Sequence, residues 1–384
     1  MTEFVPNNQI TLLRNGTEYF PALERAIDVA HVEVHLQTYI YEDDAIGRRI
    51  AAALIRAAQR GVTVCLLLDG YGCKDTPKTL IREMQLGGVE VVFYRPKISP
   101  WTFKRRRLRR LHRKIAVVDG QVAFVGGINI IDDMNTPGHT PPRVDYAVQV
   151  EGQLLKAIQA SVRRLWRRTA WAHLRRVKPS KLTGLLPTAA GNMWAAYVTR
   201  DNVLHRHDIE AAYLSAIESA RSEIIIANAY FLPGRDFRRA LAGAARRGVR
   251  VVLLLQARVE YWLVDYATRA LYQNFLAAGI EIHEYHTSFM HSKVAVIDHH
   301  WATVGSSNID PVSLWLAREA NIVVDDKSFA KQLREDLEQA LQKDARPIFL
   351  KDWSHASLAR RSTAWFTYYL VRLAIGLTGL PDKA

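Results

Sequence analysis

The sequence predicts an α/β protein made of two copies of one domain, each with a largely parallel sheet flanked by helices. Two observations carry this prediction. Apolar, β-branched runs alternate with runs whose apolar residues recur at helical spacing, a pattern typical of α/β sandwiches. The order of these runs in residues 8–152 returns in residues 193–345, together with the same polar motif. We therefore expect a duplication at the scale of a domain.

The first half begins with an entry strand and a helix, which we expect between Asn8 and Ala30. There follow a strand over residues 32–40, a helix over 43–60, a strand over 62–69, a helix over 77–87 and a strand over 89–96. Gly61 lies just past the second helix, where glycine is common because it adopts a left-handed conformation without strain. The run VTVCLLLD (62–69) is apolar nearly throughout, so we expect a strand that is buried on both faces.

The second half repeats this order. EIIIANAYF (223–231) corresponds to EVHLQTYIY (33–41), and residues 235–256 correspond to residues 46–69. FLAAGIEIHEYH then corresponds to MQLGGVEVVFYRP. The halves differ mainly before the polar motif, where the first half has the additional segment SPWTFKRRRLRR (99–110). Its aromatic and basic side chains suit a membrane interface, and a plain surface loop is the alternative.

The polar motif reads LHRKIAVVDGQVAFVGGIN in residues 111–129 and MHSKVAVIDHHWATVGSSN in residues 290–308. Five positions match at identical spacing: His112 with His291, Lys114 with Lys293, Asp119 with Asp298, Gly126 with Gly305, and Asn129 with Asn308. Because side chains alternate along a strand, each histidine and its lysine share one face at the start of a strand. A single His-x-Lys would suit an ordinary surface histidine, but two matched copies argue against that interpretation.

These residue types suit the chemistry of one phosphodiester. Two imidazoles can lie on opposite sides of the phosphorus, where one attacks it and the other protonates the departing alkoxide. The roles then reverse, and an incoming hydroxyl resolves the phosphohistidine. Lys114, Lys293, Asn129 and Asn308 would hold the phosphate oxygens. The pocket works only if both halves contribute to it.

The doubled pattern His-x-Lys-x4-Asp-x6-Gly-[Gly/Ser]-x-Asn resembles the signature of the phospholipase D superfamily, over about residues 8–324. The resemblance implies two tandem phospholipase D-like α/β sandwich domains with pseudo-twofold symmetry and the active site at their interface. We expect the first domain in residues 1–152, a basic amphipathic helix and linker in 153–192, the second domain in 193–345 and a membrane-associating tail in 346–384.

Within the superfamily, GGIN and GSSNIDPVSLWLAREANIVVDD make the chain similar to bacterial cardiolipin synthases of the short type without N-terminal transmembrane helices. The implied activity is that of a phosphatidyltransferase, which moves a phosphatidyl group from one phospholipid onto the hydroxyl of phosphatidylglycerol. No cofactor is needed, because one phosphodiester replaces another. We expect His112 to be the nucleophile and His291 the acid-base, although pseudo-symmetry leaves the reverse assignment open.

Two rival functions remain open. A phospholipase D-type phosphodiesterase that hydrolyses phospholipid or nucleic acid would use the same residues, and a non-catalytic module that binds anionic surfaces would explain the charge. The apolar, aromatic tail argues against nucleic acid, and the paired motifs argue against a mere binding module. Hydrolysis of phospholipid therefore stays the closest alternative to phosphatidyl transfer.

Acidic residues elsewhere in each half have assignable roles. In the superfamily an acid at the place of Asp145 or Glu319 bonds an imidazole, fixes its tautomer and stabilises its cation, so we assign both residues this orienting role. Asp119 and Asp298 complete the catalytic motifs, but they lie several residues from the histidines, which favours a structural salt bridge over proton transfer. Four further histidines lack a companion cluster of carboxylates or cysteines, so we expect no metal site: His283, His286, His299 and His300.

Charge and composition indicate an anionic partner. The net charge is +14, with basic clusters in residues 104–114 and 153–178. Such clusters favour an anionic membrane surface or nucleic acid. Residues 153–176 predict an amphipathic helix, which we expect to pack on the first sheet, with membrane contact as the alternative. The tail AWFTYYLVRLAIGLTGL (364–380) predicts an interfacial helix, with packing onto the protein as the alternative.

The expected location is the bacterial cell membrane, where the protein would associate peripherally on the cytoplasmic side. Two cysteines are too few for a disulfide framework and suggest a reducing compartment. The start MTEFVPNNQ does not resemble a secretory signal, and no uncharged apolar stretch is long enough to span a bilayer.

Overall fold

The computed structural model describes residues 2–96, 109–175, 189–201, 204–258, 262–310, 313 and 317–351. Most of the additional basic segment, most of the predicted linker and all of the predicted interfacial helix lie outside these residues. No helix among the described residues is both long and apolar enough to span a membrane.

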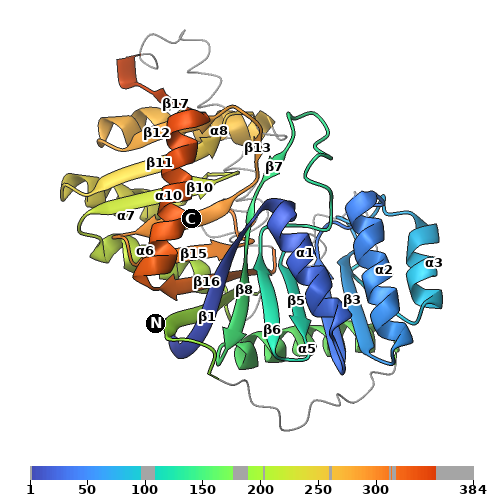
Figure 1. Ribbon diagram of the computed structural model, residues 1–384. Coiled ribbons are helices and arrows are strands. Elements are labelled where there is room, and N and C mark those ends of the chain that lie inside the picture. The colour runs from blue at the N-terminus through green and yellow to red at the C-terminus, as the bar shows by residue number, and fades with distance from the viewer. Residues whose placement is uncertain are drawn as a thin grey trace.

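The first half contains the predicted elements in the predicted order (Figure 1). They are β1 (Val5–Arg14), α1 (Asn15–Asp28), β2 (Glu33–Thr38), α2 (Ala45–Gln59), β3 (Thr63–Asp69), α3 (Lys78–Leu86), β4 (Glu90–Tyr94), β5 (Lys114–Val118), β6 (Val122–Gly126), β7 (Arg143–Val144), β8 (Tyr146–Gly152) and α5 (Leu155–Ala172). Asp44 begins α2 as its N-cap, because its carboxylate accepts the N–H of Gly47 at 2.9 Å.

The second half repeats the same series and confirms the duplication. It contains β9 (Met193–Arg200), α6 (Asp208–Ser219), β10 (Glu223–Asn228), α7 (Arg235–Arg246), β11 (Arg250–Gln256), α8 (Trp262–Ala277), β12 (Glu281–Tyr285), β13 (Phe289–Met290), β14 (Lys293–Ile297), β15 (Trp301–Gly305), β16 (Glu319–Asp325), α10 (Lys327–Lys343) and β17 (Ala345–Ile348).

Fifteen of these strands form one sheet, in the order β17-β12-β11-β10-β14-β15-β16-β9-β1-β8-β6-β5-β2-β3-β4. The order is symmetric about the β9–β1 pair, apart from β17 at one edge. The predicted α/β architecture is correct, but the prediction of largely parallel sheets is wrong. Only β2-β3-β4 and β10-β11-β12 pair in parallel, and the remaining pairings in this sheet are antiparallel.

The motif hairpins account for two of these antiparallel pairings. Asp119 and Gly120 both have positive φ, as do Asp298 and His299, so each motif contains a tight turn between two strands. Such a turn joins β5 to β6 and β14 to β15 as antiparallel neighbours. A parallel pair would need a crossover connection of a dozen or more residues.

The helices divide between the two faces of the sheet. Those on one side, α1 to α3 and α6 to α8, cover two separate apolar clusters, one in each half. On the other side α5 and α10 share one cluster that takes strands from both halves. The predicted amphipathic helix is therefore present as α5, which buries Ile158 and Val162 in this cluster and exposes Arg164, Arg167 and Arg168.

Candidate active site

Each motif is held by backbone contacts to the opposite half of the chain. The N–H of His112 bonds the carbonyl oxygen of Arg318 at 3.0 Å, where Leu111 forms a parallel bridge with Arg318. In the reciprocal contact, β13 pairs in parallel with β7, and the N–H of His291 bonds the carbonyl oxygen of Val144 at 2.8 Å. These two contacts bring the segments of His112 and His291 into one region, as the paired motifs predict.

The two histidines pair with acids in the same crossed manner. Nδ1 of His112 lies 2.9 Å from Oε1 of Glu319, and Nδ1 of His291 lies 2.7 Å from Oδ2 of Asp145. Because an ionised carboxylate only accepts hydrogen bonds, Nδ1 carries the hydrogen in each pair, and Nε2 of a neutral ring then keeps its lone pair. The imidazoles are 16% and 13% exposed, so both remain accessible, whereas Glu319 and Asp145 are buried.

The motif lysines lie beneath the histidines. Nζ of Lys114 donates to the carbonyl oxygen of His112 at 2.7 Å, and Nζ of Lys293 contacts the carbonyl oxygen of His291. Burial lowers the pKa of Lys114 to about 7 and that of Lys293 to about 8, against the attraction of Glu319 and Asp145. Both ammonium groups act on the same two carboxylates, which is expected of one shared cationic pocket.

Electrostatics around His291 keep its ring neutral. Burial, followed by the ammonium of Lys293 at 2.9 Å from Nδ1, lowers the pKa of His291 to about 3. Burial alone would raise the pKa of Asp145, but Lys293 and His291 outweigh it and lower that pKa. A neutral imidazole beside an ionised carboxylate is the state that a general base needs.

The motif asparagines are both buried. The side-chain oxygen of Asn129 accepts the N–H of Ile40 at 3.1 Å, which ties Asn129 to the loop after β2. That loop also carries Tyr39, whose ring lies 4.9 Å from the imidazole of His112. The side-chain oxygen of Asn308 is buried and has no hydrogen-bond partner within the described ranges. Phosphate binding by the two asparagines stays a prediction.

Asp119 and Asp298 lie apart from the histidines, and among the described residues neither forms the salt bridge that we expected for them. Each lies at the far end of its strand from the histidine and accepts backbone N–H groups instead. Asp119 accepts those of His31, Val32 and Glu33 at 2.7, 2.9 and 2.8 Å. Asp298 accepts those of Arg221, Ser222 and Glu223 at 2.7, 2.8 and 3.0 Å. Positive φ at both aspartates turns the carboxylates onto the start of the neighbouring strand in the sheet, which is β2 for Asp119 and β10 for Asp298.

Sequence reasoning missed Asp69 and Gln256, which end β3 and β11. Asp69 accepts the N–H of Leu111 at 2.7 Å, and the side-chain oxygen of Gln256 accepts the N–H of Met290 at 2.8 Å. Each side chain thus holds the residue just before a motif histidine. Their matched place in the repeat, LLLD against LLLQ, was the available signal.

A second missed pair accounts for the difference between GGIN and GSSN. A side chain at Gly127 would meet the carboxylate of Asp145, so glycine is required there. At the equivalent position, Ser306 donates its hydroxyl to Oε2 of Glu319 at 2.5 Å. The longer side chain, Glu319, is therefore held by the hydroxyl group of Ser306, and the shorter one, Asp145, packs against Gly127.

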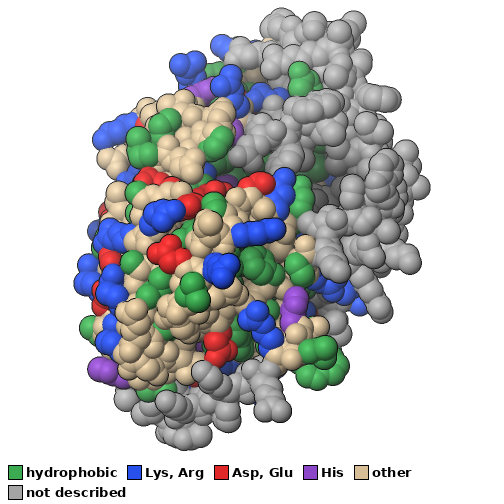
Figure 2. Space-filling model, turned by 90° about the vertical axis from the view of Figure 1, so that its right-hand side faces the viewer, with side chains coloured by type: hydrophobic (Ala, Val, Ile, Leu, Met, Phe, Trp, Pro, Cys, Tyr) green, Lys and Arg blue, Asp and Glu red, His purple; other side chains and the backbone are tan. Residues whose placement is uncertain are grey.

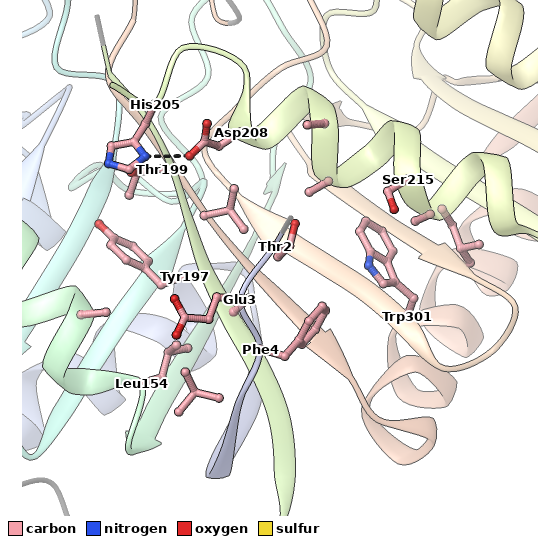
Figure 3. Close-up of a pocket in the computed structure, with 18 of the residues that line it drawn as sticks. Thr2, Glu3, Phe4, Leu154, Tyr197, Thr199, His205, Asp208, Ser215 and Trp301 are labelled. Atoms are coloured by element: carbon pink, nitrogen blue, oxygen red, sulfur yellow. Dashed lines mark hydrogen bonds and ion pairs between the residues drawn. The ribbon is translucent and has the colours of Figure 1, made fainter. Parts of the chain in front are cut away.

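A cavity of about 1550 Å³ lies along β9 between α5 and α6, away from this site (Figure 3). Its lining includes Phe4, Tyr197, His205 and Trp301. Of the five matched motif positions in each half, only Asp298 contributes to the lining. The cavity is therefore separate from the histidines.

The four histidines that we did not expect to bind metal each lie near an acid, such as His300 beside Asp325 at 2.6 Å. In the described part of the chain no three His, Cys, Asp or Glu side chains form a group suited to a metal ion.

Basic side chains are spread over the face in Figure 2 and are interleaved with acidic and hydrophobic ones, so the positive charge of this face is not confined to one patch.

A duplicated α/β chain that brings two His-Lys pairs together, each histidine backed by an acid of the other half, is a phospholipase D-type enzyme. The model of the family "Cardiolipin synthase, PLD-like domain" matches residues 23–137 and 213–341. The chain belongs to this family, the cardiolipin synthases of the phospholipase D superfamily.

Curated relatives and solved structures agree with this placement. Cardiolipin synthase B of Escherichia coli K12 is 40% identical over 351 residues, which are 89% of this chain and 82% of that protein. Cardiolipin synthase 1 of Staphylococcus epidermidis is 30% identical over 90% of this chain and 72% of its own length. The crystal structure of phosphatidylserine synthase from Haemophilus influenzae has the same fold, with a TM-score of 0.69 at 12% identity, over 96% of this chain and 94% of that one.

Proposed function

We propose that this protein is a cardiolipin synthase, which transfers a phosphatidyl group from a donor phospholipid to phosphatidylglycerol. The observation that carries the proposal is the crossed pairing of His112 with Glu319 and of His291 with Asp145. It supports one pocket with two available Nε2 atoms, as transfer through a phosphohistidine requires. The similarity to curated cardiolipin synthases supports phospholipid as the substrate class.

In the first step, Nε2 of His112 attacks the phosphorus of the donor. The bond from phosphorus to the headgroup oxygen breaks, and His291 in its protonated form gives its proton to that oxygen. Glycerol leaves when the donor is phosphatidylglycerol. Lys114, Lys293 and the two asparagine amides bind the remaining phosphate oxygens, where the negative charge lies.

In the second step, neutral His291 takes the proton from the hydroxyl of an incoming phosphatidylglycerol. The resulting oxygen attacks the phosphohistidine, the bond from phosphorus to His112 breaks, and cardiolipin is released. The low pKa of His291 keeps the ring neutral, with a lone pair that can accept a proton, before the substrate binds. A phosphate anion bound beside Lys293 would raise that pKa again and so allow His291 to carry the proton of the first step.

The enzyme would act at an anionic bilayer, which it approaches as a peripheral protein from the cytoplasmic side. The end of α5 supports this, because Trp171 and Leu174 are 77% and 95% exposed among exposed arginines. An aromatic ring, a leucine and cations at one helix end suit the headgroup region of a membrane.

The test is to incubate the purified protein with phosphatidylglycerol vesicles and, separately, with supercoiled DNA. Cardiolipin formation, followed by thin-layer chromatography, supports transfer, and the His112→Ala and His291→Ala variants should each abolish it. Phosphatidic acid as the only product would mean that the enzyme hydrolyses the phospholipid and does not transfer the phosphatidyl group. Nicked DNA with unchanged lipid would contradict a lipid substrate altogether.

A further inference from the structure

We propose that Arg143, stacked on Phe289, binds the phosphodiester of the acceptor lipid, so that the acceptor reaches the phosphohistidine along the His291 side of the pocket. This inference rests on the proposed function and adds the acceptor site to it. An acceptor that is itself a phospholipid brings a second negative charge, which the two motif lysines do not serve while they hold the first phosphate.

Strand geometry places Arg143 beside the catalytic pair. Arg143 and Asp145 are two residues apart on an extended segment, and Phe289 and His291 are two residues apart on the paired one. Because side chains alternate, Arg143 points to the same side as Asp145, and Phe289 to the same side as His291. Two residues along a strand span roughly 6–7 Å, which is comparable to the three-carbon glycerol bridge between the phosphates of cardiolipin.

The side chains of Arg143, Phe289 and His291 lie next to one another in this order. The guanidinium carbon of Arg143 lies 5.5 Å from the centroid of the Phe289 ring, and that ring lies 5.8 Å from the ring of His291. His139 stacks on Phe289 with centroids 4.1 Å apart. A guanidinium fixed against an aromatic ring keeps a defined fork of donors, which suits a phosphate.

The positive charge of Arg143 acts on the pocket. It contributes to the lowered pKa values of both His291 and Lys293. Two carboxyl groups face Arg143 from neighbouring segments, Glu42 and Asp133, and Nη2 of Arg143 donates to the backbone oxygen of Asn135 at 3.1 Å. Burial raises the pKa values of both carboxyl groups, to about 6 for Asp133, whereas the charge of Arg143 acts to lower them.

The His112 side of the pocket differs at the matching positions. There the strand contact pairs Leu111 with Arg318, and the next position outward has Ala317 where the other side has Arg143. Arginines on this side include Arg318, which donates to the hydroxyl of Tyr94 at 3.2 Å, and Arg200, which bonds the carbonyl oxygen of Ala317. Arg110 lies over the Tyr71 ring at 5.3 Å and faces the carboxylate of Asp69. At the place of Asp69 the other half has the neutral Gln256. The charge of Arg110 is thus opposed by a buried acid, and this difference favours the His291 side for the second anion.

The difference also bears on the roles of the histidines. In an in-line exchange the acceptor hydroxyl approaches the phosphorus opposite the bond to the nucleophile. An acceptor held by Arg143 beside His291 therefore gives its proton to His291 and displaces His112. The proposed acceptor site beside His291 therefore makes His112 the nucleophile.

The experiment measures how the phosphohistidine partitions between two acceptors. Full-length wild-type protein, Arg143→Gln, Arg143→Lys and Arg110→Gln are incubated with phosphatidylglycerol vesicles in the presence of ethanol. Cardiolipin and phosphatidylethanol arise from the same intermediate, so their ratio is independent of the fraction of folded enzyme. We expect Arg143→Gln to lower the ratio of cardiolipin to phosphatidylethanol roughly tenfold or more, as loss of one charge-assisted contact would. Arg143→Lys should recover most of the ratio.

Arg110→Gln is the matched variant for the opposite side, and Arg246→Gln, exposed on α7, controls for loss of one surface charge. An unchanged ratio in Arg143→Gln, or a fall in Arg110→Gln alone, would overturn the proposed acceptor site. A wild-type protein that makes phosphatidylethanol but no cardiolipin would instead refute the proposed function, and the acceptor site with it.

Discussion

Nδ1 of His112 lies 2.9 Å from a carboxylate oxygen of Glu319, although the two residues belong to opposite halves of the chain. The pair of His291 and Asp145 crosses between the halves in the other direction at 2.7 Å. Neither half therefore contains a complete histidine–acid pair. The duplication yields one shared site only because each half supplies the acid that orients the other half's imidazole.

Glu319→Gln and Asp145→Asn should each lower kcat by roughly 10²–10⁴-fold, because an amide does not enforce the Nδ1–H tautomer or stabilise the imidazolium. The crossed pairing makes a more specific prediction for imidazole ¹⁵N spectra: Glu319→Gln should shift the signals of His112, and Asp145→Asn those of His291. Asp325→Asn, which alters the surface pair with His300, should leave both catalytic rings unchanged. Shifts confined to the histidine of the same half would contradict the crossed arrangement.

Lys114→Met should stabilise the protein while it removes activity. Burial depresses the pKa of Lys114 to about 7 from its ordinary 10.5, so the native state holds this proton less tightly than the unfolded state does. Below about pH 7 the buried charge lowers the free energy of unfolding by its full amount. This destabilisation disappears as the pH rises toward 10.5. The gain in free energy of unfolding should be on the order of a few kcal/mol at pH 6.5 and much smaller at pH 10.

Denaturant unfolding of Lys114→Met at these two pH values measures the effect. Lys331→Met, at a lysine whose side chain is 73% exposed on α10, is the control and should show no such pH dependence. A variant that is equally destabilised at both pH values would mean that Lys114 stabilises the fold.

Anion binding should weaken as the pH rises through the pKa values of the two motif lysines. Lys114 loses its proton near pH 7 and Lys293 near pH 8, and each loss removes a positive charge from the pocket. A bound anion stabilises the protonated lysines, so anion binding declines at a higher pH than these pKa values. Inhibition by sulfate, whose own charge is constant here, should weaken at least tenfold between pH 6.5 and 9.5. Inhibition that does not change over this range would contradict lysine-based binding.

Asp119→Asn and Asp298→Asn should lower stability by about 1–2 kcal/mol each, because an amide cannot accept all of the backbone N–H groups that the carboxylate accepts. The kcat per folded molecule should change little, since both side chains lie at the far ends of their strands. Thermal unfolding and active-site titration separate the two effects. Glu335→Gln on the exposed face of α10 serves as the control. A large loss of kcat in a fully folded Asp119→Asn variant would return Asp119 to the catalytic groups.

The sequence predicted the repeat, the motif residues and the helical and strand segments because these depend on local spacing. His112 and Lys114 share one strand face by simple alternation, and the orienting acids follow the motif in each half. The identity of each acid's partner depends on how the halves dock, and no spacing in the chain encodes that.

Other differences also have physical causes. Two of the antiparallel pairings arise from the turns at Asp119 and Asp298, whose carboxylates form backbone hydrogen bonds that a search for charged partners overlooks. The sequence indicates only that Asp69 ends a strand, because its role depends on Leu111, which lies 42 residues further along the chain. Such contacts appear only once the strands are assembled.

The central claim is that His112 and His291 act on one phosphorus atom. Orthovanadate mimics phosphorus in an in-line exchange, so its binding counts the sites directly. Calorimetric titration should give one vanadate per chain, and His112→Ala or His291→Ala alone should each abolish binding. Two vanadates per chain, or full binding to either single variant, would contradict the shared site.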